Sequence, residues 1–304
     1  MIPRSGRQFT LSHHEYRAEI AAVGATLRAL CHSGRDLVVP FGVDEVRPAY
    51  RGATLAPWPN RIVDGRYRSG GAGLQLPLTE PARGHALHGL VAWLDFAEQA
   101  AQPDRVVLVA TIEPQSGYPF RVEVEVEYRL DDDGLTQTVT ARNIGPDAAP
   151  WGTGPHPYLV GGAGRVDDWT LLLPASEVLT VTEDRLIPTG IEQIDAHPEW
   201  DFRMPRRIGD VFIDHAFTAL ARMDDLAQVR VTAPDGTGVA MTWDRRCPWV
   251  QIHTADDPGL PDAHRVGLAV EPMTCPPDAF NSGVDLVTLE AGDEYAASWR
   301  ISAV

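Results

Sequence analysis

The sequence predicts an all-β fold formed by one antiparallel domain over residues 1–304. Hydrophobic and polar residues alternate with period two in several segments, as they do in half-buried strands. Proline and glycine, 25 and 27 in number, interrupt the chain throughout, and no long segment shows a helical hydrophobic stripe free of them. Many short strands between frequent turns favour a sandwich or barrel, and no linker, repeat or change of composition marks a domain boundary.

The clearest element is a hairpin. In residues 121–130 valines and a tyrosine alternate with charged residues, which predicts one buried and one solvated face. The acidic turn Asp131–Gly134 then leads into residues 135–143, which are rich in β-branched side chains. We interpret this turn as solvated, because it lacks the further ligands of a calcium loop.

Shorter strands are expected along the rest of the chain, each bounded by turn residues. The glycine-rich segments 70–73 and 161–164 are interpreted as turns, because neither joins a strand to a helix as a phosphate-binding loop would. The expected strands are Tyr16–Ile20, Thr26–Cys31, Val106–Ile112, Trp169–Leu173, Val229–Thr232, Val239–Trp243, Trp249–His253, Leu268–Val270 and Tyr295–Ile301.

Charge and composition restrict the partners. The formal net charge of −16 disfavours nucleic acid and anionic membrane surfaces, and leaves small neutral molecules as plausible ligands. The three cysteines, Cys31, Cys247 and Cys275, lie far apart and argue against a disulfide framework. No apolar leader or membrane-spanning stretch is found, so we expect a cytoplasmic protein. The sequence leaves a monomer and a homodimer both open.

Glu271 is the first candidate for a catalytic residue. It ends the short apolar run 267–270 and is followed directly by Pro272, so we expect it at the rim of a sheet. Apolar neighbours remove hydration from a carboxylate and raise its pKa toward the range useful for a base. The alternative is an ion pair with an arginine at a strand end.

Two further candidates precede the middle of the chain. Arg61 follows a stiff Pro-Trp-Pro segment, and a fixed guanidinium suits recognition of hydroxyl or carboxylate groups. His88 lies next to Gly89, which allows close approach of a ligand, although a satisfied core histidine is equally consistent. His85 and His88 are spaced as metal ligands can be, but no third ligand is evident, and we expect no metal.

The last two candidates are a histidine and an aspartate. His156 lies between two prolines, which can hold an imidazole rigidly enough to act as a general acid. Asp214 lies in an apolar strand-like segment, where a turn-capping role is the alternative. An aromatic wall for a sugar could come from tryptophans that are more often core residues, namely Trp58, Trp93, Trp151 and Trp243.

Taken in this order, the motifs resemble those of the aldose 1-epimerase (galactose mutarotase-like) family. The matching elements are Asn60-Arg61-Ile62, His85-Ala-Leu-His88-Gly89, His156-Pro-Tyr158, the Asp214 segment and Glu271-Pro, and they span the chain from about residue 50 to its end. The family's fold is an antiparallel β-supersandwich. The segment around His156 departs from the family pattern, since many members have a polar residue before the histidine and Phe-Asn after the tyrosine.

The resemblance implies roles for these residues. Glu271 matches the general base and His156 the general acid, which would lie on opposite sides of the sugar. Arg61, His88 and Asp214 match residues that bind its hydroxyls, and no metal or organic cofactor is implied. The expected activity is the interconversion of the α and β anomers of an aldose through ring opening and closure.

Three alternatives remain at this point. The chain could be a carbohydrate-binding protein without catalysis, or an epimerase for a phosphorylated or sulfonated sugar, although we expect a neutral aldohexose or a similar aldose. It could also be a glycoside hydrolase that uses Asp214 and Glu271 as its carboxylate pair. Sequence alone leaves open which aldose is used.

Overall fold

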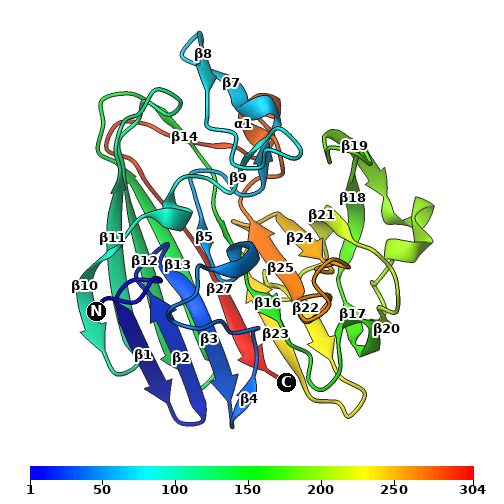
Figure 1. Ribbon diagram of the computed structural model, residues 1–304. Helices are drawn as coiled ribbons and strands as arrows, with labels where there is room; N and C mark the ends of the chain where they lie inside the picture. The colour runs from blue at the N-terminus through cyan, green and yellow to red at the C-terminus, as the bar shows by residue number, and fades with distance from the viewer.

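The computed structural model describes all residues, 1–304, and is built almost entirely from β-strands. Its largest element is one extended sheet, which two smaller sheets cover on one side, with short strand pairs between them (Figure 1). Strand pairing within the sheets is antiparallel throughout. The expected antiparallel β-supersandwich is therefore confirmed.

The extended sheet has nine strands, and its centre is formed by the C-terminal strand lying beside the predicted hairpin. In order across the sheet, the strands are β10 (Ala97–Gln102), β11 (Arg105–Ile112), β12 (Val122–Asp131), β13 (Gly134–Asn143), β27 (Glu294–Ala303), β23 (Gly238–Trp243), β22 (Ala227–Thr232), β17 (Thr170–Leu172) and β20 (Arg206–Arg207).

The two covering sheets lie over different halves of this sheet. One has four strands in sequence order: β1 (Gln8–His13), β2 (Tyr16–Ala21), β3 (Thr26–His32) and β4 (Arg35–Asp36). The other has six, in the order β16 (Tyr158–Leu159), β25 (Leu268–Met273), β24 (Trp249–His253), β21 (Asp214–Leu220), β18 (Ala175–Val181) and β19 (Pro188–Gln193).

Short strand pairs join the layers at the centre and upper end of the molecule in Figure 1. The only α-helix is the single turn α1 (Ala279–Ser282), so no helix is long enough to cross a membrane. The pairs are β5 (Thr54–Leu55) with β15 (Gly154–Pro155), β6 (Arg61–Ile62) with β9 (Ala86–Leu87), β7 (Arg66–Ser69) with β8 (Ala72–Gln75), and β14 (Ala149–Trp151) with β26 (Val287–Leu289).

The predicted hairpin forms with the expected register. Val122, Val124, Val126 and Tyr128 are fully buried, and the glutamates between them face outward. Gly134 pairs with Asp131 at φ 123°, where a Cβ atom would overlap a carbonyl of β27. This close approach explains the glycine at the end of the acidic turn.

Every predicted strand is present within one to three residues of its expected ends. The largest difference is at Leu268–Val270, where β25 continues through Glu271 and Pro272 to Met273. Gln251 and Val250 of β24 pair opposite Glu271 and Pro272, so the strand tolerates the proline. Glu271 is therefore an interior strand residue and does not lie at the rim of the sheet.

Candidate active site

The five residues selected from the sequence come together around the junction of the two covering sheets. Glu271 lies on β25 and Asp214 at the start of β21, which are both neighbours of β24. Arg61 and His88 come from β6 and from the residue after β9, which pair with each other. His156 lies between β15 and β16.

Glu271 and His156 form the centre of this cluster. The Nε2 atom of His156 lies 3.5 Å from Oε1 of Glu271, and both side chains are almost fully buried. The other carboxylate oxygen, Oε2, and the Nδ1 atom of His156 are buried without a hydrogen-bond partner in the protein. Buried polar atoms are normally paired, so these two atoms are available to a ligand. The two groups lie side by side, which corrects the expectation that they face each other across a sugar.

The backbone fixes the position of His156. Its N–H donates to the carbonyl of Ala53 (3.0 Å), and its carbonyl accepts from the N–H of Gly52 (2.8 Å). Gly52 has φ 66°, and a Cβ atom there would overlap the carbonyl of Leu27, so the position requires glycine. The imidazole also stacks on Tyr158 at 5.3 Å between ring centroids.

His88 is held as a hydrogen-bond donor. Its Nδ1 accepts from the backbone N–H of Asn60 at 3.2 Å, so the proton of the neutral ring is on Nε2. The ring meets that of His156 edge-on at 4.8 Å between centroids. His88 has φ 61°, and the Gly89 that follows it has φ 75°. This unusual backbone directs the ring into the cluster.

Arg61 is fixed by a carboxylate that sequence reasoning missed. Its Nε donates to Oε2 of Glu80 at 2.8 Å and its Nη2 to Oε1 at 3.1 Å, in a paired geometry. Both side chains are largely buried. Arg61 does not pair directly with Glu271, which removes the simple strand-end ion pair as an account of that residue. No pattern around Glu80 marks it in the sequence.

Asp214 is oriented by a second missed residue, Gln251. The side-chain amide of Gln251 donates to Oδ1 of Asp214 at 2.7 Å, and Gln251 lies opposite Glu271 in the sheet. Alternation along the predicted strand Trp249–His253 places residues 249, 251 and 253 on one face, and this signal was available in the sequence. Asp214 therefore lies within β21 and does not cap a turn.

The aromatic wall differs from the expectation. Trp58, Trp151 and Trp243 are buried core residues, whereas Trp93 is 51% exposed. Tyr50, which sequence reasoning missed, lies between Trp93 (6.0 Å between centroids) and His88 (4.7 Å). Together Tyr50 and Trp93 form an aromatic edge beside the cluster.

Burial shifts the pKa values of the central pair in opposite directions. Burial, together with the neighbouring imidazole of His253, lowers the pKa of His156 to about 3. It raises the pKa of Glu271 well above its ordinary value, and the negative charge of Asp214 adds to this while Arg61 opposes it. These shifts favour the form of the pair in which Glu271 carries the proton and His156 is neutral.

The surrounding groups have the protonation states that ligand binding needs. Burial, with the neighbouring His156 and Arg61, holds the pKa of His88 well below its usual range, so the ring is a neutral donor. Burial alone would raise the pKa of Asp214, but His253, Arg61 and the bond from Gln251 lower it overall. Asp214 is thus a charged hydrogen-bond acceptor.

The donor set also bears on metal binding. The donor atoms of His88, His156 and Glu271 all lie within 4.8 Å of one another. However, the Asn60 N–H occupies the Nδ1 lone pair of His88 and leaves a proton, not a lone pair, on Nε2. A histidine that binds a metal through one ring nitrogen normally donates the N–H of its other ring nitrogen to a carboxylate, a carbonyl or water. The arrangement suits hydrogen bonding to a ligand and does not suit a metal ion. His85 likewise uses both ring nitrogens, with the Asp64 N–H and the Arg185 carbonyl.

Comparison with known proteins agrees with this fold. The sequence profile of the aldose 1-epimerase family matches residues 7–302, and the chain belongs to this family.

Individual relatives cover most of the chain. It is 38% identical over 299 residues to the uncharacterized protein YihR of Escherichia coli strain K12, covering 98% of this chain and 93% of YihR. It is 28% identical over 232 residues to the galactose mutarotase of Mus musculus, covering 70% of this chain and 66% of the mouse protein. Its structure resembles the GalM/aldose epimerase homologue of Caenorhabditis elegans with a TM-score of 0.86 at 20% identity, covering 98% of each chain.

Proposed function

We propose that the protein is a mutarotase, an isomerase that interconverts the α and β anomers of a neutral aldose. The observation that carries this proposal is the buried pair of His156 and Glu271, whose Nε2 and Oε1 atoms lie 3.5 Å apart and whose pKa values are shifted in opposite directions. Anomerisation moves protons on two oxygens, O1 and the ring oxygen O5, which are bonded to the same carbon. Two adjacent groups suit two adjacent oxygens.

The reaction balances because the enzyme accepts one proton and donates another in each half of the cycle. Glu271, as carboxylate, takes the proton of the O1 hydroxyl while protonated His156 gives its proton to O5, and the C1–O5 bond breaks to leave an open-chain aldehyde. Rotation about C1–C2 presents the other face of the aldehyde. Ring closure then returns the proton from O5 to His156 and from Glu271 to O1.

In the sugar-free enzyme, Glu271 and His156 can reach the protonation states that this cycle needs without exchanging protons with water. Burial favours the form in which Glu271 carries the proton and His156 is neutral. Movement of that proton to His156 gives the base and acid required, and the positive charge of Arg61 favours the carboxylate so formed. Each positioned proton transfer contributes on the order of 10²–10⁴-fold to the rate.

The remaining residues bind and orient the sugar in this proposal. Arg61, fixed by Glu80, and the Nε2–H of His88 donate to hydroxyl groups, and Asp214 accepts from one. Tyr50 and Trp93 offer an apolar edge of the kind that packs against the C–H face of a sugar. The open-chain aldehyde meets no lysine, since the chain contains none, and so cannot be diverted into a lysine imine.

The test is to follow optical rotation after dissolving the α-anomers of glucose and galactose with purified protein. We expect the decay to equilibrium rotation to accelerate in proportion to enzyme concentration. Faster turnover of a 6-phosphorylated or sulfonated sugar would move the substrate class to anionic sugars. Sugar binding with an unchanged decay would make the protein a carbohydrate-binding module, and release of nitrophenol from an aryl glycoside would make it a hydrolase.

A further inference from the structure

A second cluster of chemically active side chains lies far from the candidate active site, where two turns meet. His13 is the last residue of β1, His14 begins the turn to β2, and Asp132 lies in the turn between β12 and β13. The Nε2 atoms of His13 and His14 lie 2.8 and 3.4 Å from the same carboxylate oxygen, Oδ1 of Asp132. The ligand-type atoms of the three residues all lie within 4.8 Å of one another.

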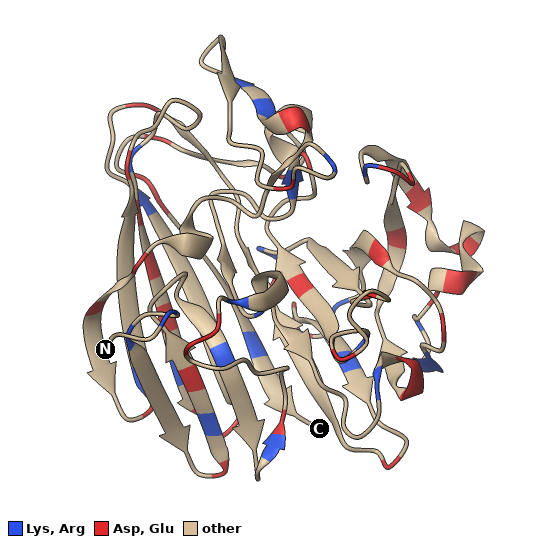
Figure 2. Cartoon of the chain, viewed as in Figure 1, with Lys and Arg blue, Asp and Glu red and all other residues tan.

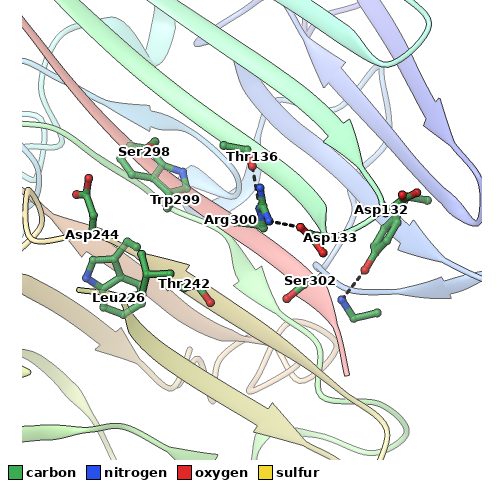
Figure 3. Close-up of a pocket in the computed structure, with 13 residues that line it drawn as sticks. Asp132, Asp133, Thr136, Leu226, Thr242, Asp244, Ser298, Trp299, Arg300 and Ser302 are labelled. Atoms are coloured by element: carbon green, nitrogen blue, oxygen red, sulfur yellow. Dashed lines mark hydrogen bonds and ion pairs between the residues drawn. The ribbon is translucent and has the colours of Figure 1, made fainter. Parts of the chain in front are cut away.

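The neighbouring acidic residues of the hairpin turn are engaged elsewhere. Arg300 on β27 donates to Asp133 at 2.9 Å and to Asp131 at 3.4 Å. Figure 3 shows the bond between Arg300 and Asp133, with Asp132 outside it. Asp132 is therefore the carboxylate of this turn that faces the histidines.

The backbone of the histidine turn favours this convergence. His14 adopts φ 47°, a left-handed conformation in which histidine, asparagine and aspartate are found more often than other non-glycine residues. The two imidazole rings lie nearly perpendicular, with an interplanar angle of 82° and centroids 4.5 Å apart. Both rings thus reach one oxygen from different directions.

We propose that His13, His14 and Asp132 form a surface site for a divalent transition-metal ion of the zinc class. Zinc prefers imidazole nitrogen and carboxylate oxygen at about 2.0–2.2 Å in a tetrahedron, which places neighbouring ligand atoms about 3.3 Å apart. The two nitrogen–oxygen separations of 2.8 and 3.4 Å are close to this value, and all three ligand atoms lie within 4.8 Å of one another. Water completes the fourth position, as in other three-ligand sites.

The two histidines can adopt the tautomer that metal binding needs. The Nε2 of His13 lies at hydrogen-bond distance from Asp132, and which ring nitrogen carries the proton depends on the tautomer. The ring nitrogens of His13 and His14 make no hydrogen bond to the backbone, unlike Nδ1 of His88 in the candidate active site. In the tautomer with the ring proton on Nδ1, which can be donated to water, Nε2 of each histidine offers its lone pair to a metal ion.

The site would join two layers of the fold. His13 and His14 belong to the four-stranded sheet and Asp132 to the nine-stranded sheet, and β1 packs against β12. A bound ion would hold these two hairpin turns together. Ligand binding to the native state alone stabilises that state by mass action.

The test is isothermal titration of the intact, tag-free protein with zinc chloride, alongside H14A, D132N and the control variant H197A. His197 is also an imidazole between carboxylates, those of Glu192 and Glu199, but has no second histidine. We expect one zinc ion per chain, binding at least about tenfold more weakly to H14A and D132N and unchanged in H197A. Zinc should also raise the melting temperature of the wild type and of H197A, but not of H14A.

Two results would overturn this site. One is the absence of measurable zinc binding to the wild type. The other is binding that survives H14A and D132N and is lost in E271Q, which would place the ion in the candidate active site. Neither result bears on mutarotation, because the titration measures no turnover.

Discussion

Glu271 and His156 are held with fewer partners than buried polar groups normally have. The Oε2 of Glu271 and the Nδ1 of His156 make no hydrogen bond within the protein. An unpaired buried polar atom costs roughly 1–3 kcal/mol of stability. Such costs are typical of sites organised for a ligand, where the missing partners are supplied on binding.

Replacing Glu271 by glutamine should therefore stabilise the free protein above mildly acidic pH. The folded pKa of Glu271 is raised by burial, so the native state retains a proton that the unfolded chain releases near pH 4.3. The native state loses stability as pH rises from that value through the raised pKa, and glutamine avoids this loss. We expect a gain of about 0.5–2 kcal/mol in urea unfolding at pH 8 that vanishes near pH 4. A gain in unfolding free energy that is the same at both pH values, or larger at pH 4 than at pH 8, would contradict the raised pKa of Glu271.

The pH dependence of turnover follows from the same pair. Burial lowers the pKa of His156 to about 3 and raises that of Glu271, and both shifts favour a pair that keeps one proton as pH rises. The value of kcat/KM reports ionisations of the free enzyme. We predict that kcat/KM, corrected for catalysis by the buffer, stays constant between pH 5.5 and 7.5. The measurement samples pH at intervals of about half a unit. A limb centred near pH 6.5, the ordinary pKa of histidine, would show that His156 titrates freely.

At the scale of elements, β6 and β9 place Arg61 and His88 on the same side of the candidate site. Their pairing sets Arg61 opposite Leu87, the residue before His88. The loop between them carries Glu80, whose carboxylate fixes the guanidinium. Arg83 also donates to Glu80 at 2.9 Å, so the loop closes on itself around this carboxylate.

Replacing Glu80 by glutamine should weaken sugar binding more than it slows the chemical step. The variant keeps the shape but loses the charge that orients Arg61, and a hydrogen bond to a charged group contributes about 1.5–3 kcal/mol. We expect KM to rise about tenfold or more with a smaller change in kcat, and the melting temperature to fall. E98Q is the matched control, since Glu98 pairs with the exposed Arg7 on an outer strand. Equal effects of E80Q and E98Q on KM would remove Arg61 positioning from the account.

At the scale of the whole molecule, the sequence predicted the strands well because their signal is local. Alternation and turn residues marked the hairpin of β12 and β13, and Trp249–His253 matches β24. The order of the strands in three sheets comes from long-range pairing, such as β13 with β27, which no local pattern encodes.

The candidate site was predictable only in part, for the same reason. The five polar residues were found because each lies beside prolines, glycines or apolar runs that resemble the family motifs. Glu80 and Tyr50 were missed because their roles depend on partners distant in the chain, Arg61 and His88. The continuation of β25 through Pro272 was missed because proline normally ends a strand, whereas here β24 pairs alongside it.

The charge of the whole chain supports a neutral substrate. Figure 2 shows basic positions scattered along the chain among acidic ones. With a net charge of −16, an anionic sugar would be repelled at long range, and its kcat/KM would rise as salt screens that field. We predict that kcat/KM for the preferred aldose changes less than about twofold between low and physiological salt. A clear increase with salt would indicate an anionic substrate.

The most direct test of the account compares the wild type with E271Q by polarimetry on fresh α-anomers, with sugar binding measured by calorimetry. The account predicts that E271Q binds the sugar but loses about 10²–10⁴-fold of the catalysed rate, because an amide cannot take the proton of O1. Glu290→Gln, an exposed change, should leave the rate unaltered. Near wild-type turnover by E271Q would contradict the proposed mechanism and remove Glu271 from the chemistry.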